Sequence, residues 1–523
     1  MTTHTHTTID PTLLTCHPHG GVMVETSAGL VQFGVPAGAV KDIFGSFLNK
    51  KILALRDTNP YRLIPHYYVH NENYIPKTTG MLPLEFLQYT PFFLYSDRIF
   101  TEKRPEFCMN FIASDAKITQ RLKDYLHISL LGPSDDELSK PLNTMITDEY
   151  PQGTPKNEIP DMRAELAFHK NAEPHELARY TSFANNVFKT DGVVITITGP
   201  LSYEIIDKNQ TLGTLNLAAY PIPKRTLVPK LNYQLKPGFD TLIAHIVASN
   251  TPAFIPITAE HGFATNDFEG TSGLVILNNQ QALVVDPPFN TVEFLAENDL
   301  LKYVNAILIT HGHGDHLTSA FAELLMLKPD IHIYSSPTVL SMITLQCQRA
   351  LGMNSWITDG WNTRTLGMQQ FHKINGMWFR FEYGFHSTPA FGFEIWDRPD
   401  CQKGNLQLFF SGDSYLGKNL YKTDNLAKKG IMPEGRRQNT LRVFDLLTKT
   451  ALQKTPPWFL IEAGIAPLHT PAADTMDRLK ELKLQHPIDD SRILLYHNTT
   501  ANIENTPGAK KWNAGEMASI LLL

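Results

Sequence analysis

Cysteine is scarce in this sequence, which contains four cysteines in 523 residues. They are widely separated and form no Cys-x-x-Cys pair, which excludes a disulfide framework and a zinc ribbon and is typical of a reducing compartment. Long apolar runs are also missing, since stretches such as 92–95 fall far short of the roughly 18 residues of a membrane-spanning helix. The N-terminal segment lacks a cationic stretch followed by an apolar one, so no secretory signal is expected. These absences predict a soluble, cytoplasmic protein with no membrane partner.

An excess of basic residues is absent as well. The chain has 46 Lys and Arg against 52 Asp and Glu, a net charge of −6, and so has no overall positive field to hold a nucleic-acid backbone. Its hydrophobic fraction of 42% and charged fraction of 19% exclude disordered, collagen-like and coiled-coil classes. At roughly 100–200 residues per domain, the length corresponds to two to four domains. The sequence therefore predicts a globular protein and argues against a nucleic-acid partner.

The first 250 residues carry secondary-structure signals but no chemical motif. Residues 192–198 predict a strand, and residues 161–188 have a helical composition. Residues 133–160 are rich in Pro, Asp, Ser and Thr and predict a long surface excursion. No internal repeat is visible. We predict an N-terminal α+β domain over 1–250 that covers a cleft or forms a homo-oligomer interface.

From residue 252 onward, apolar strands alternate with helices, which is typical of an α/β fold. A second domain is predicted over 251–523, with the boundary near 245–252. The predicted strands are 253–258, 273–277, 282–286, 304–310, 331–334, 377–383, 406–410, 459–462 and 492–496, and the predicted helices are 292–302 and 337–350.

The strongest chemical signal directly follows the predicted strand 304–310. It is the segment HGHGDH, residues 311–316. Imidazoles and a carboxylate are suitable ligands for zinc, manganese or iron, and the glycines would let the backbone turn tightly so that the ligands converge. A polar loop that is His-rich by chance would not explain why three histidines and an aspartate, separated by glycines, directly follow a buried strand. The segment therefore predicts a metal site with the candidate ligands His311, His313, Asp315 and His316.

This His-x-His-x-Asp-His string resembles that of the metallo-β-lactamase superfamily of hydrolases. The resemblance covers about 252–523 and implies an α/β (α+β) fold class, with an αββα sandwich of two mixed sheets in addition to the N-terminal α+β domain. It also implies three later ligands, each after a strand. The candidates are His386 in GFHST, Asp413 in LFFSGD and His497 in RILLYH.

The resemblance implies that these residues hold two divalent ions, which are zinc, manganese or iron. Two ions about 3.5–4 Å apart would lower the pKa of a bridging water, so that hydroxide attacks near pH 7. Asp315 would orient this nucleophile as well as bind a metal. One ion would be bound by His311, His313, His386 and Asp413, and the other by Asp315, His316, His497 and the shared Asp413.

Several segments resemble the phosphodiesterase branch of this superfamily. The segment SGDS at 411–414 resembles tRNA 3′-processing nucleases and cyclic-nucleotide phosphodiesterases. The segments at 384–393 and 462–471, and more loosely the one at 32–42, are similar to bacterial 3′,5′-cyclic AMP/GMP phosphodiesterases. The resemblance thus implies hydrolysis of a small nucleotide phosphodiester, 3′,5′-cyclic AMP or GMP.

The chain departs from the nuclease branch at one point. That branch has a His-Glu pair before its last ligand, which helps to protonate the leaving group. Here Glu462 takes the Glu position, but Ile461 precedes it. His469 is our candidate proton donor, and a loop histidine bonded to backbone is the equally good alternative interpretation.

Candidate substrate contacts come from segments around the expected cleft. Arg436 and Arg437 would bind a phosphate, although a solvated face is the alternative interpretation of such cations. The turn between the first two strands of the fold should border the metal site. It supplies the candidates His261, Asn266 and Ser272.

The same metal site is compatible with two other functions. One is hydrolysis of an ester, a thioester or a lactone. The other is a non-catalytic nucleotide sensor that retains the metals, against which the complete ligand set argues. The small-molecule phosphodiester remains the preferred substrate.

Overall fold

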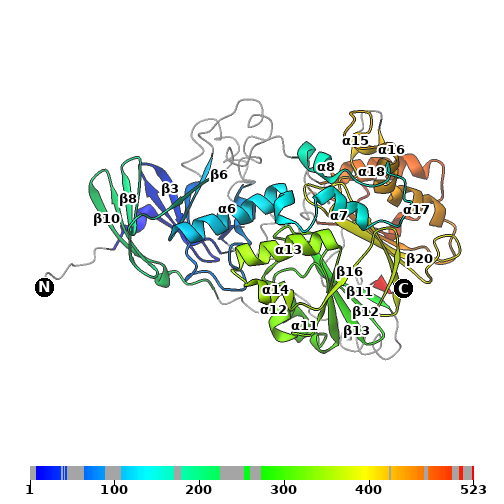
Figure 1. Cartoon of the computed structure of the whole chain (residues 1–523), viewed down its shortest axis with the longest axis horizontal. Helices are drawn as coiled ribbons and strands as arrows, with labels where there is room; N and C mark the ends of the chain where they lie inside the picture. The colour runs from blue at the N-terminus through cyan, green and yellow to red at the C-terminus, as the bar shows by residue number, and fades with distance from the viewer. Residues whose placement is uncertain are drawn as a thin grey trace.

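The computed structural model contains two α/β halves, coloured blue to teal and green to red in Figure 1. We refer to residues 8–223 as the N-terminal half and to residues 252–522 as the C-terminal half. The structure describes residues 8–36, 39–40, 42–43, 64–88, 108–169, 178–223, 252–259, 272–422, 426–464, 469–497, 506–510 and 521–522.

The C-terminal half consists of two mixed sheets whose inner faces share one core. Leu283 and Val285 of the first sheet and Phe379 and Phe393 of the second belong to the same cluster of buried side chains. The first sheet has the order β16-β15-β14-β13-β12-β11-β23 and the second the order β17-β18-β19-β20-β21-β22. Their strands are β11 (Ala253–Ala259), β12 (Ser272–Asn278), β13 (Gln281–Val285), β14 (Val304–Leu308), β15 (His332–Ser335), β16 (Thr363–Thr365), β17 (Phe371–Ile374), β18 (Met377–Tyr383), β19 (Phe391–Trp396), β20 (Leu406–Phe410), β21 (Trp458–Glu462), β22 (Ile493–Tyr496) and β23 (Leu521–Leu522).

Helices cover the outer faces of both sheets. Phe294 and Ile343 are buried with the first sheet, and Phe444 and Leu479 with the second. This arrangement confirms the predicted αββα sandwich. The helices are α11 (Thr291–Glu297), α12 (Ser319–Leu327), α13 (Pro337–Ala350), α14 (Ser355–Asp359), α15 (Lys418–Tyr421), α16 (Glu434–Thr440), α17 (Arg442–Thr450) and α18 (Ala472–Lys483).

The N-terminal half also contains two sheets. One has six strands in the order β1 to β6, and the other has four in the order β10 to β7. The strands are β1 (Leu14–Cys16), β2 (Val22–Thr26), β3 (Gly29–Phe33), β4 (Pro65–Val69), β5 (Met109–Ala113), β6 (Ala178–Ser182), β7 (Val187–Thr190), β8 (Val193–Gly199), β9 (Ser202–Asp207) and β10 (Gln210–Asn216), and the helices are α3 (Leu84–Gln88), α6 (Ala116–Leu131), α7 (Leu142–Asp148) and α8 (Met162–His169).

The two halves have the same strand topology. In the N-terminal half, β1 to β3 pair antiparallel and β3 to β6 pair parallel. In the C-terminal half, β11 to β13 pair antiparallel and β13 to β16 pair parallel. Four antiparallel strands follow in each case, β7 to β10 and β17 to β20. The chain therefore contains this topology twice, a repeat that the sequence does not reveal.

The halves meet through the corresponding helices α6 and α13, which pack against each other (Figure 1). Both helices have a polar N-cap that binds a backbone amide: Asp115 accepts from Ile118 N, and Ser336 accepts from Val339 N. Tyr125 on α6 belongs to the same buried core as the two C-terminal sheets. The N-terminal half thus shares part of its hydrophobic core with the sandwich.

Two sequence-based predictions for the N-terminal half were wrong. Among its described residues, the predicted helix 161–188 is helical at its start, in α8, but then contains strand β6 and the first residues of β7. Strand β6 includes Tyr180 and Thr181, which favour strands, and it pairs in parallel with β5. The predicted surface excursion 133–160 contains helix α7 and buried Tyr150, whose hydroxyl donates to Glu382 of β18. Much of the segment is exposed, but Leu142, Met145 and Ile146 of α7 are buried, so this part of the excursion belongs to the core.

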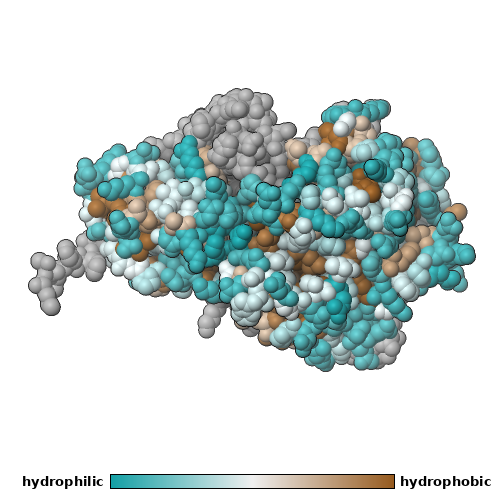
Figure 2. All heavy atoms as spheres, in the orientation of Figure 1, coloured by the Kyte–Doolittle hydropathy of each residue, from teal (hydrophilic) through white to brown (hydrophobic). Residues whose placement is uncertain are grey.

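The surface of the described residues shows no extended apolar face on the side drawn in Figure 2, where hydrophilic residues predominate. In the described part of the chain, no helix combines the length and the hydropathy needed to cross a membrane.

Candidate metal centre

The seven predicted metal ligands lie at the carboxyl ends of strands in both sheets of the C-terminal half. The loop 311–316 follows β14, and His386 follows β18. Asp413 follows β20 and His497 directly follows β22. All seven side chains are buried, with exposed fractions between 0 and 7%. Strand ends of two facing sheets thus bring together residues that are up to 186 positions apart in sequence, from 311 to 497.

Three histidines form one group of potential ligands. His311, His313 and His386 each offer a ring nitrogen, and these atoms lie within 4.8 Å of one another. His386 Nε2 is 3.0 Å from His313 Nδ1. Such a spacing of nitrogens fits three positions around a single transition-metal ion.

A second group combines a carboxylate with two histidines. Asp315, His316 and His497 offer ligand atoms within 4.8 Å of one another. Asp315 Oδ2 is 3.1 Å from His497 Nε2 and 3.9 Å from His316 Nε2. His497 has φ +62°, in the left-handed region that non-glycine residues seldom adopt. The end of β22 is therefore held in an unfavourable conformation that directs this side chain into the group.

Asp413 lies between the two groups. Its Oδ2 is 3.2 Å from His316 Nε2, 3.6 Å from His497 Nε2 and 3.8 Å from His311 Nε2. Both Asp413 oxygens are buried and make no hydrogen bond to the described residues, and the same holds for the Nε2 atoms of His311 and His316. Buried polar atoms without a partner are costly in a protein interior. These unsatisfied nitrogens and oxygens fit bound divalent cations.

The protonation states reflect the negative charge that two carboxylates bring into this buried group. Burial lowers the pKa of His311 and His386 far below the ordinary value, so their rings are neutral. Burial opposes the charge of Asp413, but His497 and His316 hold its pKa well below the usual range. Burial likewise opposes a charge on His497, yet Asp413 and Asp315 raise its pKa to about 10. Without a cation, the two carboxylates are thus balanced by a proton on His497. A divalent cation would supply the positive charge in place of that proton, because only a neutral imidazole binds a metal.

Asp286 supports the two groups from behind. Its Oδ2 is 3.0 Å from His316 Nδ1, and its two oxygens accept hydrogen bonds from the hydroxyl and amide of Thr310. The Thr310 hydroxyl in turn contacts His311 Nδ1 at 3.0 Å. Such partners fix the orientation of ligating imidazoles. Sequence reasoning missed Asp286, although its position at the end of the apolar run 282–285 was a usable signal.

No protein-family model matches the chain. The cGMP-dependent 3′,5′-cGMP phosphodiesterase A of Dictyostelium discoideum is 27% identical over 345 residues, which cover 62% of this chain and 36% of that protein. The cAMP/cGMP-dependent 3′,5′-cAMP/cGMP phosphodiesterase B of the same organism is 26% identical over 228 residues, covering 43% and 19%. The chain thus spans well under half the length of the curated relatives that it matches.

The fold is identified by the combination of architecture and ligand positions. The C-terminal half has two facing mixed sheets with helices outside them. Its HGHGDH loop lies beside later His and Asp residues that also stand at strand ends. The C-terminal half has the metallo-β-lactamase fold. Among solved structures, the metallo-β-lactamase fold protein YhfI of Bacillus subtilis covers 52% of this chain and 100% of its own, with 14% identity and a TM-score of 0.35.

The HGHGDH loop makes the predicted tight turn, in which His316 N donates to the carbonyl oxygen of His313 at 2.9 Å, and its glycines have a further role in packing. Neither Gly312 nor Gly314 has a left-handed φ. A Cβ on Gly312 would lie 2.3 Å from Gln346 Oε1 of α13, and one on Gly314 would lie 2.9 Å from the carbonyl oxygen of Leu82. The metallo-β-lactamase loop needs glycine because α13 and the N-terminal half press against it.

Glu462 and His469 lie beside the two ligand groups. His469 Nδ1 is 2.8 Å from Glu462 Oε1 and 3.8 Å from Asp413 Oδ2. The amides of Gly464 and Thr470 donate to the two Glu462 oxygens, which fixes the carboxylate. The structure thus brings the candidate proton donor next to the metal ligands.

Arg436 has a different role from the predicted phosphate contact. Its side chain is fully buried and binds Glu165 of α8 at 2.9 Å, and it donates to the carbonyl oxygens of Tyr383 and Gly384. The guanidinium is satisfied by protein acceptors, so it joins the two halves beneath the His386 loop.

The other predicted substrate contacts lie as follows. Arg437 pairs with Glu434 and donates to the carbonyl oxygen of Leu420. Ser272 is buried at the start of β12. His261 and Asn266 lie outside the described residues. None of these positions tests the predicted substrate contacts.

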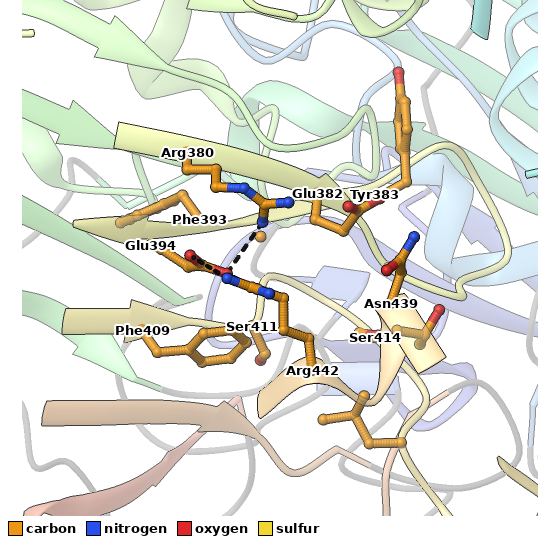
Figure 3. Close-up of a pocket in the computed structure, with 14 residues that line it drawn as sticks. Arg380, Glu382, Tyr383, Phe393, Glu394, Phe409, Ser411, Ser414, Asn439 and Arg442 are labelled. Atoms are coloured by element: carbon orange, nitrogen blue, oxygen red, sulfur yellow. Dashed lines mark hydrogen bonds and ion pairs between the residues drawn. The ribbon is translucent and has the colours of Figure 1, made fainter. Parts of the chain in front are cut away.

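A pocket beside the second sheet contains a separate charged cluster (Figure 3). Arg380 and Arg442 both bind the buried carboxylate of Glu394, which also accepts from Trp396 Nε1 at 2.8 Å. The cluster holds α17 against β18 and β19. Both arginines of the pocket are thus paired with Glu394.

Proposed function

We propose that this chain is a dinuclear metal-dependent phosphodiesterase acting on a small nucleotide phosphodiester, preferably 3′,5′-cyclic AMP or GMP. The observation that carries the proposal is the buried Asp413 carboxylate between the two ligand groups, with neither oxygen hydrogen-bonded to a described residue. The names of the two Dictyostelium relatives support the substrate class.

The residues of each group would hold one ion. His311, His313 and His386 would bind the first, Asp315, His316 and His497 the second, and Asp413 would be shared. A set of imidazoles and carboxylates without cysteine suits zinc, manganese or iron. When bound, two such ions lower the pKa of water and neutralise charge on a phosphoryl oxygen.

The side chains would divide the remaining work. Asp315 is anionic, because His316 and His497 hold its pKa well below the usual range despite burial. Its carboxylate would orient the attacking water. Glu462 would hold Nδ1 of His469, so that Nε2 carries the proton to the departing oxygen.

The reaction class is tested by assay of the metal-loaded chain. We would prepare the protein with zinc, manganese or iron and measure hydrolysis of cyclic AMP, cyclic GMP, cyclic dinucleotides, bis-p-nitrophenyl phosphate, a thioester and a lactone. Faster turnover of the cyclic mononucleotides supports the proposal. Preferential turnover of the acyl substrates would replace it with a carboxylic-ester, thioester or lactone hydrolase, and binding of cyclic AMP without release of AMP would indicate a sensor.

Replacing His469 with alanine should slow substrates according to their leaving group. A ribose alkoxide needs a proton, whereas p-nitrophenolate leaves without one. We expect kcat for the cyclic nucleotide to fall about 100-fold and kcat for bis-p-nitrophenyl phosphate to change by about threefold or less. Equal losses for both substrates would show that His469 does not protonate the leaving group.

A further inference from the structure

Three buried glutamates of the N-terminal half reach the metallo-β-lactamase half. Their exposed fractions are between 1 and 3%. Glu149 accepts from Thr338 N and from the Tyr383 hydroxyl, and Glu165 binds Arg436. The third, Glu85 of α3, is the one of these three that contacts the HGHGDH loop.

Glu85 approaches the loop with one hydrogen bond and one longer charge contact. Its Oε2 accepts a hydrogen bond of 2.9 Å from the amide of Gly314. Its Oε1 lies 3.9 Å from His313 Nε2. His313 Nδ1 is 3.0 Å from His386 Nε2 within the first ligand group. The imidazole of His313 therefore has one nitrogen toward the ligands and the other toward Glu85 and the nearby Ser387 hydroxyl, which is 3.4 Å away.

Glu85 is held rigidly in this position. The hydroxyl of Tyr125, a fully buried residue of α6, donates to the carbonyl oxygen of Leu82 at 2.9 Å and lies 3.3 Å from Glu85 Oε2. The same Leu82 carbonyl occupies the space that a side chain on Gly314 would need. The backbone before α3 and the metal loop are thus in direct contact, and hydrogen bonds from both sides hold the carboxylate in place.

We propose that Glu85 is a positioning residue, supplied by the N-terminal half, that orients His313 for metal binding and fixes the loop through the Gly314 amide. A cation at Nδ1 leaves the ring proton on Nε2, where a carboxylate is the usual partner of a metal-bound histidine. The inference rests on the proposed metal centre. It gives the N-terminal half a role in completing that centre, since the loop itself contains no carboxylate placed to do this.

Metal affinity measured site by site tests this inference. We would titrate the metal-free chain with zinc against a chromophoric chelator and record the visible spectrum of the cobalt form. Glu85→Gln keeps an acceptor for Gly314 N but cannot become a carboxylate when a cation binds, so the affinity of the site that contains His313 should fall about 10- to 100-fold while that of the other site is unchanged. Glu149→Gln, equally buried but without contact to the loop, is the matched control and should change neither site.

Two further variants make the result decisive. Glu85→Ala also removes the acceptor for Gly314 N and should weaken both sites. Tyr125→Phe keeps the carboxylate but removes its hydroxyl partner, so it should weaken the His313 site less than Glu85→Gln does. The inference would be overturned if Glu85→Gln left the affinity unchanged, or if the Glu149→Gln control lost as much affinity. If Glu85→Gln does not fold, the absence of any effect in Tyr125→Phe would overturn it. Absence of metal binding by the unaltered chain would instead refute the proposed function.

Discussion

Replacing Asp413 with asparagine should lower kcat for a cyclic nucleotide by about a thousandfold or more, because the amide removes the charge between the two ligand groups. The change conserves shape, so the sandwich should remain folded. Bound metal, measured by elemental analysis, should fall from two ions per chain towards one or none. The alanine variant should behave in the same way, since both remove the shared carboxylate.

Asp445→Asn provides the matched control. Asp445 is exposed on α17, and its substitution should leave both kcat and metal content as in the unaltered chain. If Asp413→Asn retained two ions and hydrolysed its substrate within about tenfold of the unaltered rate, a shared carboxylate would not be needed and the dinuclear proposal would be wrong.

Replacing Arg436 with methionine should cause the largest loss of stability. The substitution leaves the Glu165 carboxylate buried without its partner and removes the donors to the Tyr383 and Gly384 carbonyl oxygens. Removal of one member of a buried ion pair costs about 3–5 kcal/mol of unfolding free energy. Denaturant unfolding followed by circular dichroism would measure the difference.

The adjacent arginine is the control for that experiment. Arg437 pairs with the exposed Glu434, so Arg437→Met should cost about 1 kcal/mol or less. The double variant Arg436→Met with Glu165→Leu removes both charges and should recover much of the loss, or restore folding if the single variant does not fold. Equal effects of the Arg436 and Arg437 variants would contradict the role assigned to the buried pair.

Secondary structure in the C-terminal half followed closely from sequence. The predicted strands 377–383 and 406–410 and the predicted helix 337–350 match β18, β20 and α13. These segments have strong hydrophobic patterns, and the serine N-cap and proline at the start of α13 mark its boundary. In the N-terminal half, the wrong prediction over 161–188 arose because strand β6 forms by pairing with β5, a distant segment.

The sequence by itself determined which residues are suited to binding a metal. Six consecutive residues, HGHGDH, carry four imidazoles or carboxylates after an apolar strand, and their ligand character needs no tertiary information. The family resemblance pointed to His386, Asp413 and His497 as the later ligands, and the apolar run before each of them predicted its place at a strand end.

Only the tertiary structure decided what surrounds those residues. Glu85 is 229 positions from Gly314, and Glu165 is 271 positions from Arg436, and no local pattern distinguishes either glutamate from a surface residue. Arg436, likewise, is indistinguishable in sequence from the partly buried Arg437. These side chains become buried and paired only when the two halves, which share one strand topology, pack against each other. The free energy of a buried charge depends on what lies beside it in space rather than along the chain.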